Sequence, residues 1–228
     1  MAITQITSKR RAVSLILKCI VVAAAAVGIY LSAFGGTGGF MLGGRSFMYF
    51  TIQSNILIAL ICAVGAILLL GRSPVKNGWF ILKLVGTVSI TLTGAVFTFL
   101  LAPTLGAFAW QINNVLTHLV VPIAAIADFF VTGICGEYKK SHVLFVSIPP
   151  LAYVIYAVLC YVQGWTFADG HNYPYFFFNW EGPAGAFGFI GEFPFMGCIW
   201  WMLALGAIIL GVGFLYRAII NGMKRRYQ

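Results

Sequence analysis

The stretch "SFMYFTIQSNILIALICAVGAILLL", residues 46–70, contains no charged side chain and is long enough to cross a lipid bilayer. About 20 predominantly apolar residues in helical form span the hydrocarbon core, so this stretch predicts a transmembrane helix. Its first turns nevertheless carry Thr51, Gln53, Ser54 and Asn55. Polar groups at that depth need protein partners, because hydrocarbon supplies none. The cluster therefore indicates either contacts between helices or a functional site.

The rest of the sequence repeats this apolar character. Of the 228 residues 61% are hydrophobic and only 8% are charged, whereas an ordinary soluble domain is about a quarter charged. Six apolar runs are long enough to be membrane spans: 12–34, 46–70, 78–102, 111–134, 142–163 and 195–217. The sequence therefore predicts an all-α integral membrane protein, with residues 1–228 forming a single domain of six transmembrane helices.

The distribution of basic residues predicts the orientation of these helices. All but Arg45 of the 14 Lys and Arg residues lie at the two ends of the chain or near the second and fourth connections. Cytoplasmic loops of membrane proteins are enriched in Lys and Arg, so we expect both termini in the cytoplasm of a multi-pass cell-membrane protein. The same rule accounts for the net charge of +9 without a nucleic-acid partner.

The longest connection, residues 164–194, is then expected on the outer side. It contains "YPYFFFNWEGPAGAFGF", residues 173–189, so the predicted outer loop between the fifth and sixth helices is rich in aromatic residues. Such residues are typical of an aromatic belt at the membrane interface. They equally suit a lid over a pocket, and the sequence leaves both interpretations open.

Polar residues on the second and fourth predicted helices lie at similar depths. Thr51 and Asn55 are four residues apart and share one helix face. Gln111, Asn114 and His118, three and four residues apart, share a face by the same rule. Both helices run inward from the outer side, and Thr51 and His118 each lie on the order of 10 Å below that surface at 1.5 Å per residue. We therefore expect these two stripes to face the interior of the bundle, where Thr51 and His118 can meet.

His118 is the most versatile of these side chains. Pro122, four residues later, cannot donate to the carbonyl group of His118, so we expect the helix to kink there. An ionisable residue at membrane depth marks a functional site by default, although a neutral histidine can also simply bond across helices. His142 and His171 are expected on opposite sides of the membrane and no Cys, His and carboxylate cluster exists, so neither a metal nor a cofactor is predicted.

Two further charged residues carry open interpretations. Asp128, near the cytoplasmic side, is expected to pair with Lys83 or another buried cation. Arg45, the lone outer cation, either extends its guanidinium group to the interface or binds an anion at the outer mouth.

The segments "FMYFTIQSN" and "NNVLTHLVVP" resemble the two signature regions of a family of six-helix membrane proteins, the androgen-induced proteins that hydrolyse fatty acid esters of hydroxy fatty acids. The chain is most similar to the bacterial relatives in that family, which share "YFTIQSN", a "HxVVP" segment and a "YPY" outer loop. In the animal members an intramembrane threonine and histidine form the catalytic pair. The resemblance implies that Thr51 and His118 occupy these two positions.

Residues and resemblance together favour a lipid ester hydrolase embedded in the membrane. A threonine hydroxyl becomes a useful nucleophile when a base takes its proton, and His118 is the candidate base for Thr51. Asn55 and Asn114 are candidate donors to the developing oxyanion, Arg45 a candidate partner for a free carboxylate, and Gln111 a further substrate-binding candidate. The substrate would be a membrane lipid or fatty acyl ester. The alternative is a non-catalytic protein that binds or transports a lipid or small molecule.

Overall fold

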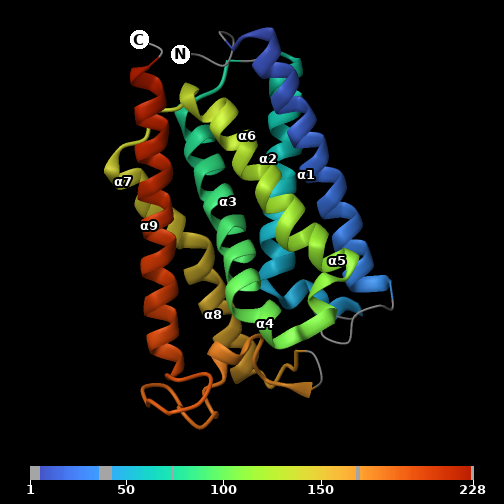
Figure 1. Ribbon diagram of the computed structural model, residues 1–228, viewed down its shortest axis with the longest axis vertical. Helices are drawn as coiled ribbons and strands as arrows, with labels where there is room; N and C mark the ends of the chain where they lie inside the picture. Colours follow the sequence, from blue (N-terminus) through green and yellow to red (C-terminus); the bar gives the residue numbers. More distant parts are fainter. Residues whose placement is uncertain (1–5, 36–42, 73, 168–169, 227–228) are drawn as a thin grey trace.

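The computed structural model describes residues 6–35, 43–72, 74–167 and 170–226 (Figure 1). Six helical spans in these ranges are long and apolar enough to cross a membrane: Ser8–Phe34, Phe50–Leu70, Asn77–Trp110, Ile112–Cys135, Lys140–Val162 and Cys198–Arg225. Each overlaps one of the six predicted runs. The expectation of a helical, multi-pass membrane protein is therefore confirmed, while the direction in which it crosses the membrane remains a prediction.

Three of the spans are single α-helices: α1 (Ser8–Phe34), α2 (Phe50–Leu70) and α9 (Cys198–Arg225). The third span consists of α3 (Asn77–Val96), a π-helical turn (Phe97–Leu101), the short helix α4 (Ala102–Leu105) and a 3₁₀ turn (Gly106–Trp110). The fourth consists of α5 (Ile112–Val115), a second π-helical turn (Leu116–Val120), α6 (Val121–Thr132) and a 3₁₀ turn (Gly133–Cys135). The fifth consists of α7 (Lys140–Val143), a 3₁₀ turn (Leu144–Ser147) and α8 (Ile148–Val162).

The span boundaries differ from the predicted ones at several ends. The third span continues to Trp110, past the predicted end at 102. Residues Gly43–Met48 form a 3₁₀ helix, so the second span begins at Phe50 instead of residue 46. The sixth span continues to Arg225, past the predicted end at 217. Its last turn holds Lys224 and Arg225, whose positive charges are favourable beside the partial negative charge of a helix C-terminus.

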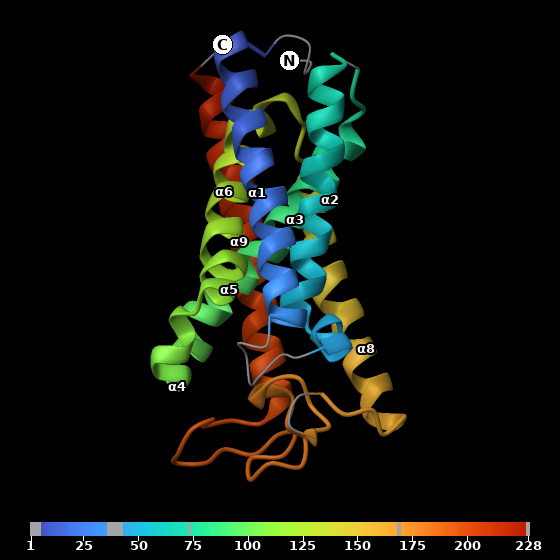
Figure 2. The same ribbon diagram turned by 90° about the vertical axis from the view of Figure 1, so that its right-hand side faces the viewer.

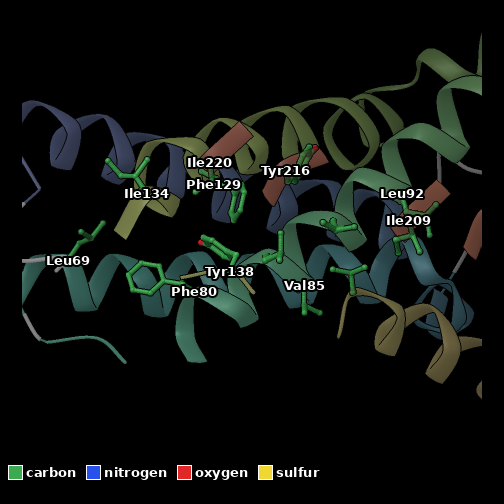
Figure 3. Packing of buried hydrophobic residues seen from close by; sticks show 13 residues of the cluster. Leu69, Phe80, Val85, Leu92, Phe129, Ile134, Tyr138, Ile209, Tyr216 and Ile220 are labelled. Atoms are coloured by element: carbon green, nitrogen blue, oxygen red, sulfur yellow. The ribbon is translucent and has the colours of Figure 1, made fainter. Parts of the chain in front are cut away.

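Both termini lie at the same end of the bundle, and the connection between α8 and α9 lies at the opposite end (Figures 1 and 2). We refer to these as the terminal end and the loop end. Helix α1 packs along α2 and α6, and α3 contacts α2 and α6 from the other side. Helix α9 contacts α3 and the turn before α8. Buried residues from several of these helices, including Phe80, Phe129, Tyr216 and Ile220, form the core shown in Figure 3.

The outward faces of the helices are apolar. Large hydrophobic side chains on α8 and α9 stay exposed in the isolated chain, among them Ile155, Val162, Leu203 and Leu215. Soluble monomers rarely expose contiguous apolar surface of this extent, whereas such a surface suits contact with lipid. The exposed apolar side chains and the lengths of the six spans therefore both indicate helices that cross a membrane.

An ion cluster links three helices nearer the terminal end. The carboxylate of Asp128 on α6 pairs with Lys18 of α1 and lies 2.7 Å from Lys83 Nζ on α3. Its second oxygen accepts a hydrogen bond of 2.5 Å from the Ser14 hydroxyl. All four side chains are buried. The expected pairing of Asp128 with Lys83 is observed, and Lys18 is a second partner. Buried charges persist only when paired and hydrogen-bonded, and here each charge has partners.

Candidate functional site

Thr51 and His118 meet inside the loop-end half of the bundle. Thr51 Oγ1 lies 3.3 Å from His118 Nε2, and the two residues are only 4% and 3% exposed. Thr51 belongs to the first turn of α2, while His118 belongs to the π-helical turn between α5 and α6. The expected proximity of these two residues, 67 positions apart in the sequence, is therefore observed at hydrogen-bonding distance.

The partners of the imidazole assign its proton. His118 Nδ1 lies 3.1 Å from the backbone oxygen of Asn114, a group that can only accept. Nδ1 also lies 3.0 Å from Thr117 Oγ1, whose own proton goes to the Asn113 carbonyl group. The network therefore places the proton on Nδ1 of the neutral ring and leaves Nε2 as an acceptor for the Thr51 hydroxyl. This is the tautomer that a general base needs.

Two π-helical turns bring a second ring against His118. The turns Phe97–Leu101 and Leu116–Val120 each come just before a proline-containing helical segment, and the N–H of Val121 donates to Leu116 O, five residues back. The interruption expected at His118 therefore takes the form of a π turn. Phe97 stacks on the imidazole, with ring centroids 3.9 Å apart and planes inclined by 17°. This contact fixes the plane of the ring.

Two glycines allow neighbouring helices to approach the turn that carries His118. A Cβ atom at Gly94 of α3 would lie 2.9 Å from the His118 carbonyl oxygen, and one at Gly28 of α1 would lie 2.7 Å from Thr117 Cγ2. Small residues at such crossings let helix backbones pack closely in membranes. Gly94 and Gly28 therefore set the position of the π turn between α1 and α3.

Tyr175 contacts the opposite side of Thr51. Its hydroxyl oxygen accepts a hydrogen bond of 3.3 Å from the Thr51 backbone N–H and lies 3.4 Å from Thr51 Oγ1. Burial raises the pKa of Tyr175, so the phenol keeps its proton at neutral pH. Sequence reasoning did not single out this residue; the available signal was the "YPY" segment, which supplies Tyr173 and Tyr175 on either side of a proline.

An apolar cavity of about 520 Å³ begins at Thr51. Its lining comes from α2, α3, α8, α9 and the connection between α8 and α9, and includes Tyr175, Phe177 and Phe178 at the loop end. Leu151 of α8 and Leu203 of α9 also line it, yet they are 59% and 60% exposed. The cavity therefore reaches the lipid-facing surface between α8 and α9, two helices that are separated towards the loop end in Figure 1.

The α8–α9 connection covers the loop end of this cavity. Tyr175 stacks on Phe177 with ring centroids 5.1 Å apart, and both pack in one cluster with Tyr49, Tyr153 and Phe167. Of the two interpretations that the sequence left open, this packing favours a lid. His118 does not border the cavity, so a molecule in the cavity would meet Thr51 first.

Of the other four candidate residues, Asn55, Asn114 and Arg45 donate side-chain hydrogen bonds to backbone oxygens. Asn55 Nδ2 donates to the backbone oxygens of Thr51 at 2.8 Å and Thr117 at 3.1 Å, which ties α2 to the π turn. Asn114 Nδ2 donates to Phe108 O, and the exposed Arg45 donates to Phe167 O. Gln111 is the half-buried residue before α5. In the described part of the chain, none of the four lines the cavity, and Asn114 contacts His118 through its backbone only.

Comparisons of the chain with protein-family models, with curated proteins and with solved structures find no match. Within the described ranges, no group of three or more His, Cys, Asp and Glu side chains is placed to hold a metal ion. What the chain can do must therefore be inferred from the Thr51–His118 pair, Tyr175 and the cavity.

Proposed function

We propose that the protein is a membrane-embedded hydrolase of lipid esters, with Thr51 as nucleophile and His118 as general base. The observation that carries this proposal is the contact of Thr51 Oγ1 with the unprotonated Nε2 of His118, at the wall of an apolar cavity. A nucleophile, a base and a group that orients the base are the recurring elements of hydroxyl-based acyl transfer. Here the Asn114 carbonyl group orients the base.

The reaction would proceed in two halves. Thr51 Oγ1 attacks the ester carbonyl carbon, its proton passes to His118 Nε2, and the electron pair of the C=O π bond moves onto the carbonyl oxygen. Collapse of this tetrahedral species breaks the bond to the alcohol oxygen, which takes the proton from His118 and leaves. Water then attacks the acyl-threonine with His118 again as base, which releases the fatty acid and restores Thr51.

The cavity supports a substrate with a long acyl chain. Its lining is almost entirely hydrocarbon, its opening lies between α8 and α9, and its volume falls in the range of small-molecule sites. An ester in the bilayer would enter sideways, place its chain against α9 and present its carbonyl group to Thr51. The sequence resemblance favours fatty acid esters of hydroxy fatty acids among such lipids. With the termini in the cytoplasm, the substrate would come from the outer leaflet of the cell membrane.

A second function fits the same cavity. Its apolar lining would hold a lipid whether or not the lipid is cleaved, with Thr51, positioned by His118, as a hydrogen-bonding partner of its head group. This non-catalytic lipid-binding protein is the main rival. Transport is less well supported, because few of the lining side chains are polar.

Turnover by purified variants separates the two functions. The protein in detergent is given long-chain acyl esters with and without a free carboxylate, and release of fatty acid is measured. We expect turnover by the wild type, none by Thr51→Ala or His118→Ala, and no further loss in the double variant, since the pair acts as one unit. Thr51→Ser should retain activity because it keeps the hydroxyl group. Equal rates of fatty acid release in wild type and Thr51→Ala would contradict the hydrolase and favour the non-catalytic lipid-binding protein.

A further inference from the structure

The backbone N–H of Thr51 and the hydroxyl group of Tyr175 converge beside the Thr51 side-chain oxygen. The N–H donates to the phenol oxygen at 3.3 Å, and that oxygen lies 3.4 Å from Thr51 Oγ1. Because the phenol oxygen already accepts the N–H and the Thr51 hydroxyl is directed at His118, the Tyr175 proton points to Thr51 Oγ1. Two donors and a nucleophile therefore share one small volume at the wall of the cavity.

The start of α2 explains why the Thr51 N–H is available. The first N–H groups of an α-helix have no acceptor within the helix. In α2, which begins at Phe50, the N–H groups of Ile52 and Gln53 both donate to Tyr49 O at 3.1 Å. The Thr51 N–H is instead directed at Tyr175. It also lies at the positive end of the dipole of a 21-residue helix, where negative charge is stabilised.

Ester cleavage requires donors at this position. Negative charge develops on the carbonyl oxygen, one bond away from the carbon that Thr51 attacks, and fixed donors beside it supply much of the rate enhancement in acyl transfer. In serine proteases the backbone N–H of the nucleophile itself is one of the two donors. The amides of Asn55 and Asn114 are bonded to backbone oxygens and do not border the cavity, so they are not available.

We propose that Tyr175 is a catalytic residue, whose O–H forms the oxyanion hole together with the Thr51 backbone N–H. This inference rests on the proposed hydrolase function. As the tetrahedral species forms, its oxyanion accepts the Thr51 N–H in place of the phenol oxygen, and the Tyr175 O–H turns from Thr51 Oγ1 to the oxyanion. Tyr175 keeps its proton throughout, and the electron pair returns to the carbonyl bond when the alcohol leaves. The lid thus contributes a reacting group as well as covering the cavity.

The ring of Tyr175 is positioned by packing that does not involve its hydroxyl group. Ring centroids of Phe177, Tyr49 and Tyr153 lie 5.1, 5.8 and 6.3 Å from that of Tyr175. Tyr175→Phe therefore removes the donor and leaves these contacts in place. A matched control is Tyr161→Phe, because the Tyr161 hydroxyl also bonds the connection, at Glu181 Oε1 2.7 Å away, but outside the cavity.

The first readout is steady-state kinetics on a long-chain ester. We expect Tyr175→Phe to lower kcat by about 100-fold or more, as removal of one oxyanion donor does, with KM little changed. Tyr161→Phe should match the wild type. If the wild type turns over the ester and Tyr175→Phe has the same kcat, the proposed role of Tyr175 is overturned but the hydrolase function is not. No turnover by the wild type would instead overturn the hydrolase function itself.

The second readout is the relative affinity for two ketone inhibitors. It distinguishes a hydrogen-bond donor to the oxyanion from a residue that only supports the structure, and it does not depend on the fraction of folded protein. Thr51 Oγ1 can attack the carbonyl carbon of a long-chain alkyl trifluoromethyl ketone and form an oxyanion. The matching methyl ketone resists this addition. We expect the wild type to prefer the trifluoromethyl ketone, and Tyr175→Phe to lose most of that preference, by a factor similar to the loss in kcat. A preference equal to that of the wild type would contradict the proposal, even if kcat fell.

Discussion

The imidazole of His118 and the ring of Phe97 lie face to face, 3.9 Å apart, and each comes from a π-helical turn. π turns inserted into α-helices are rare and often lie at functional sites. Here they bring two spans together so that one ring stacks on the other, while His118 Nε2 still faces Thr51.

Phe97→Leu tests this stacking. The substitution keeps an apolar side chain but removes the flat surface that holds the imidazole, so we expect kcat to fall by about tenfold through a misplaced base. Phe97→Tyr, which keeps the ring, should retain more activity than Phe97→Leu. Equal activity in Phe97→Leu and wild type would show that hydrogen bonds alone position His118.

Gly206→Leu tests the cavity as the acyl site. Gly206 lines the cavity, and a Cβ atom there meets no atom within 4 Å, so a leucine side chain would extend into free space. We expect the ratio of kcat/KM for long-chain over short-chain esters to fall by about tenfold or more, since pocket contacts discriminate at that level. Gly211→Leu is the control, because Gly211 is exposed on the same helix outside the cavity. A similar ratio in both variants would place the acyl chain elsewhere.

Asp128→Asn tests the ion cluster, whose role we interpret as structural. Loss of the carboxylate leaves Lys18 and Lys83 buried without a counter-charge, a change that costs about 3–5 kcal/mol in comparable pairs. We expect the melting temperature in detergent to fall by on the order of 10 °C, against little change for Glu137→Gln at an exposed position. The triple variant Lys18→Met, Lys83→Met and Asp128→Leu should recover much of the loss. No fall in Asp128→Asn would contradict a structural ion cluster.

Reporter fusions test the orientation in the membrane. The distribution of Lys and Arg predicts both termini in the cytoplasm and the α8–α9 connection outside. A reporter that is active only in the cytoplasm should therefore be active when joined after Gln228 and inactive when inserted in residues 164–194. A reporter that is active only outside the cytoplasm should give the reverse result. If the reporter after Gln228 were external and the one in residues 164–194 cytoplasmic, the site would lie in the inner leaflet. If both reporters lay in the same compartment, the model of six crossings would be ruled out.

The six spans were predictable because their signal is local. A run of about 20 apolar residues is readable in any single stretch, as at 46–70, and it depends little on packing. The meeting of Thr51 and His118 was also within reach, since both were expected at similar depth on helices that run in the same direction. Pairing of Asp128 with a buried lysine followed from the cost of an unpaired charge.

Features that depend on irregular backbone were not predictable in this way. Tyr175 comes from a connection without periodic structure, so nothing in the spacing of its residues indicated that it reaches Thr51. Asn55 was correctly expected on the face of Thr51, but its amide donates to the backbone oxygens of Thr51 and of Thr117 in the π turn. Pro122 predicted an interruption of the helix without predicting its π-helical form.

The identity of the nucleophile is tested most directly by covalent labelling. A long-chain alkyl fluorophosphonate reacts with an activated hydroxyl oxygen, releases fluoride and leaves a stable phosphonate ester that peptide mass spectrometry can locate. We predict a single adduct on Thr51 in the wild type, no adduct in Thr51→Ala, and labelling slowed by several orders of magnitude in His118→Ala, where no base takes the proton. An unlabelled Thr51 in folded wild-type protein, or equal labelling rates in wild type and His118→Ala, would contradict the catalytic pair.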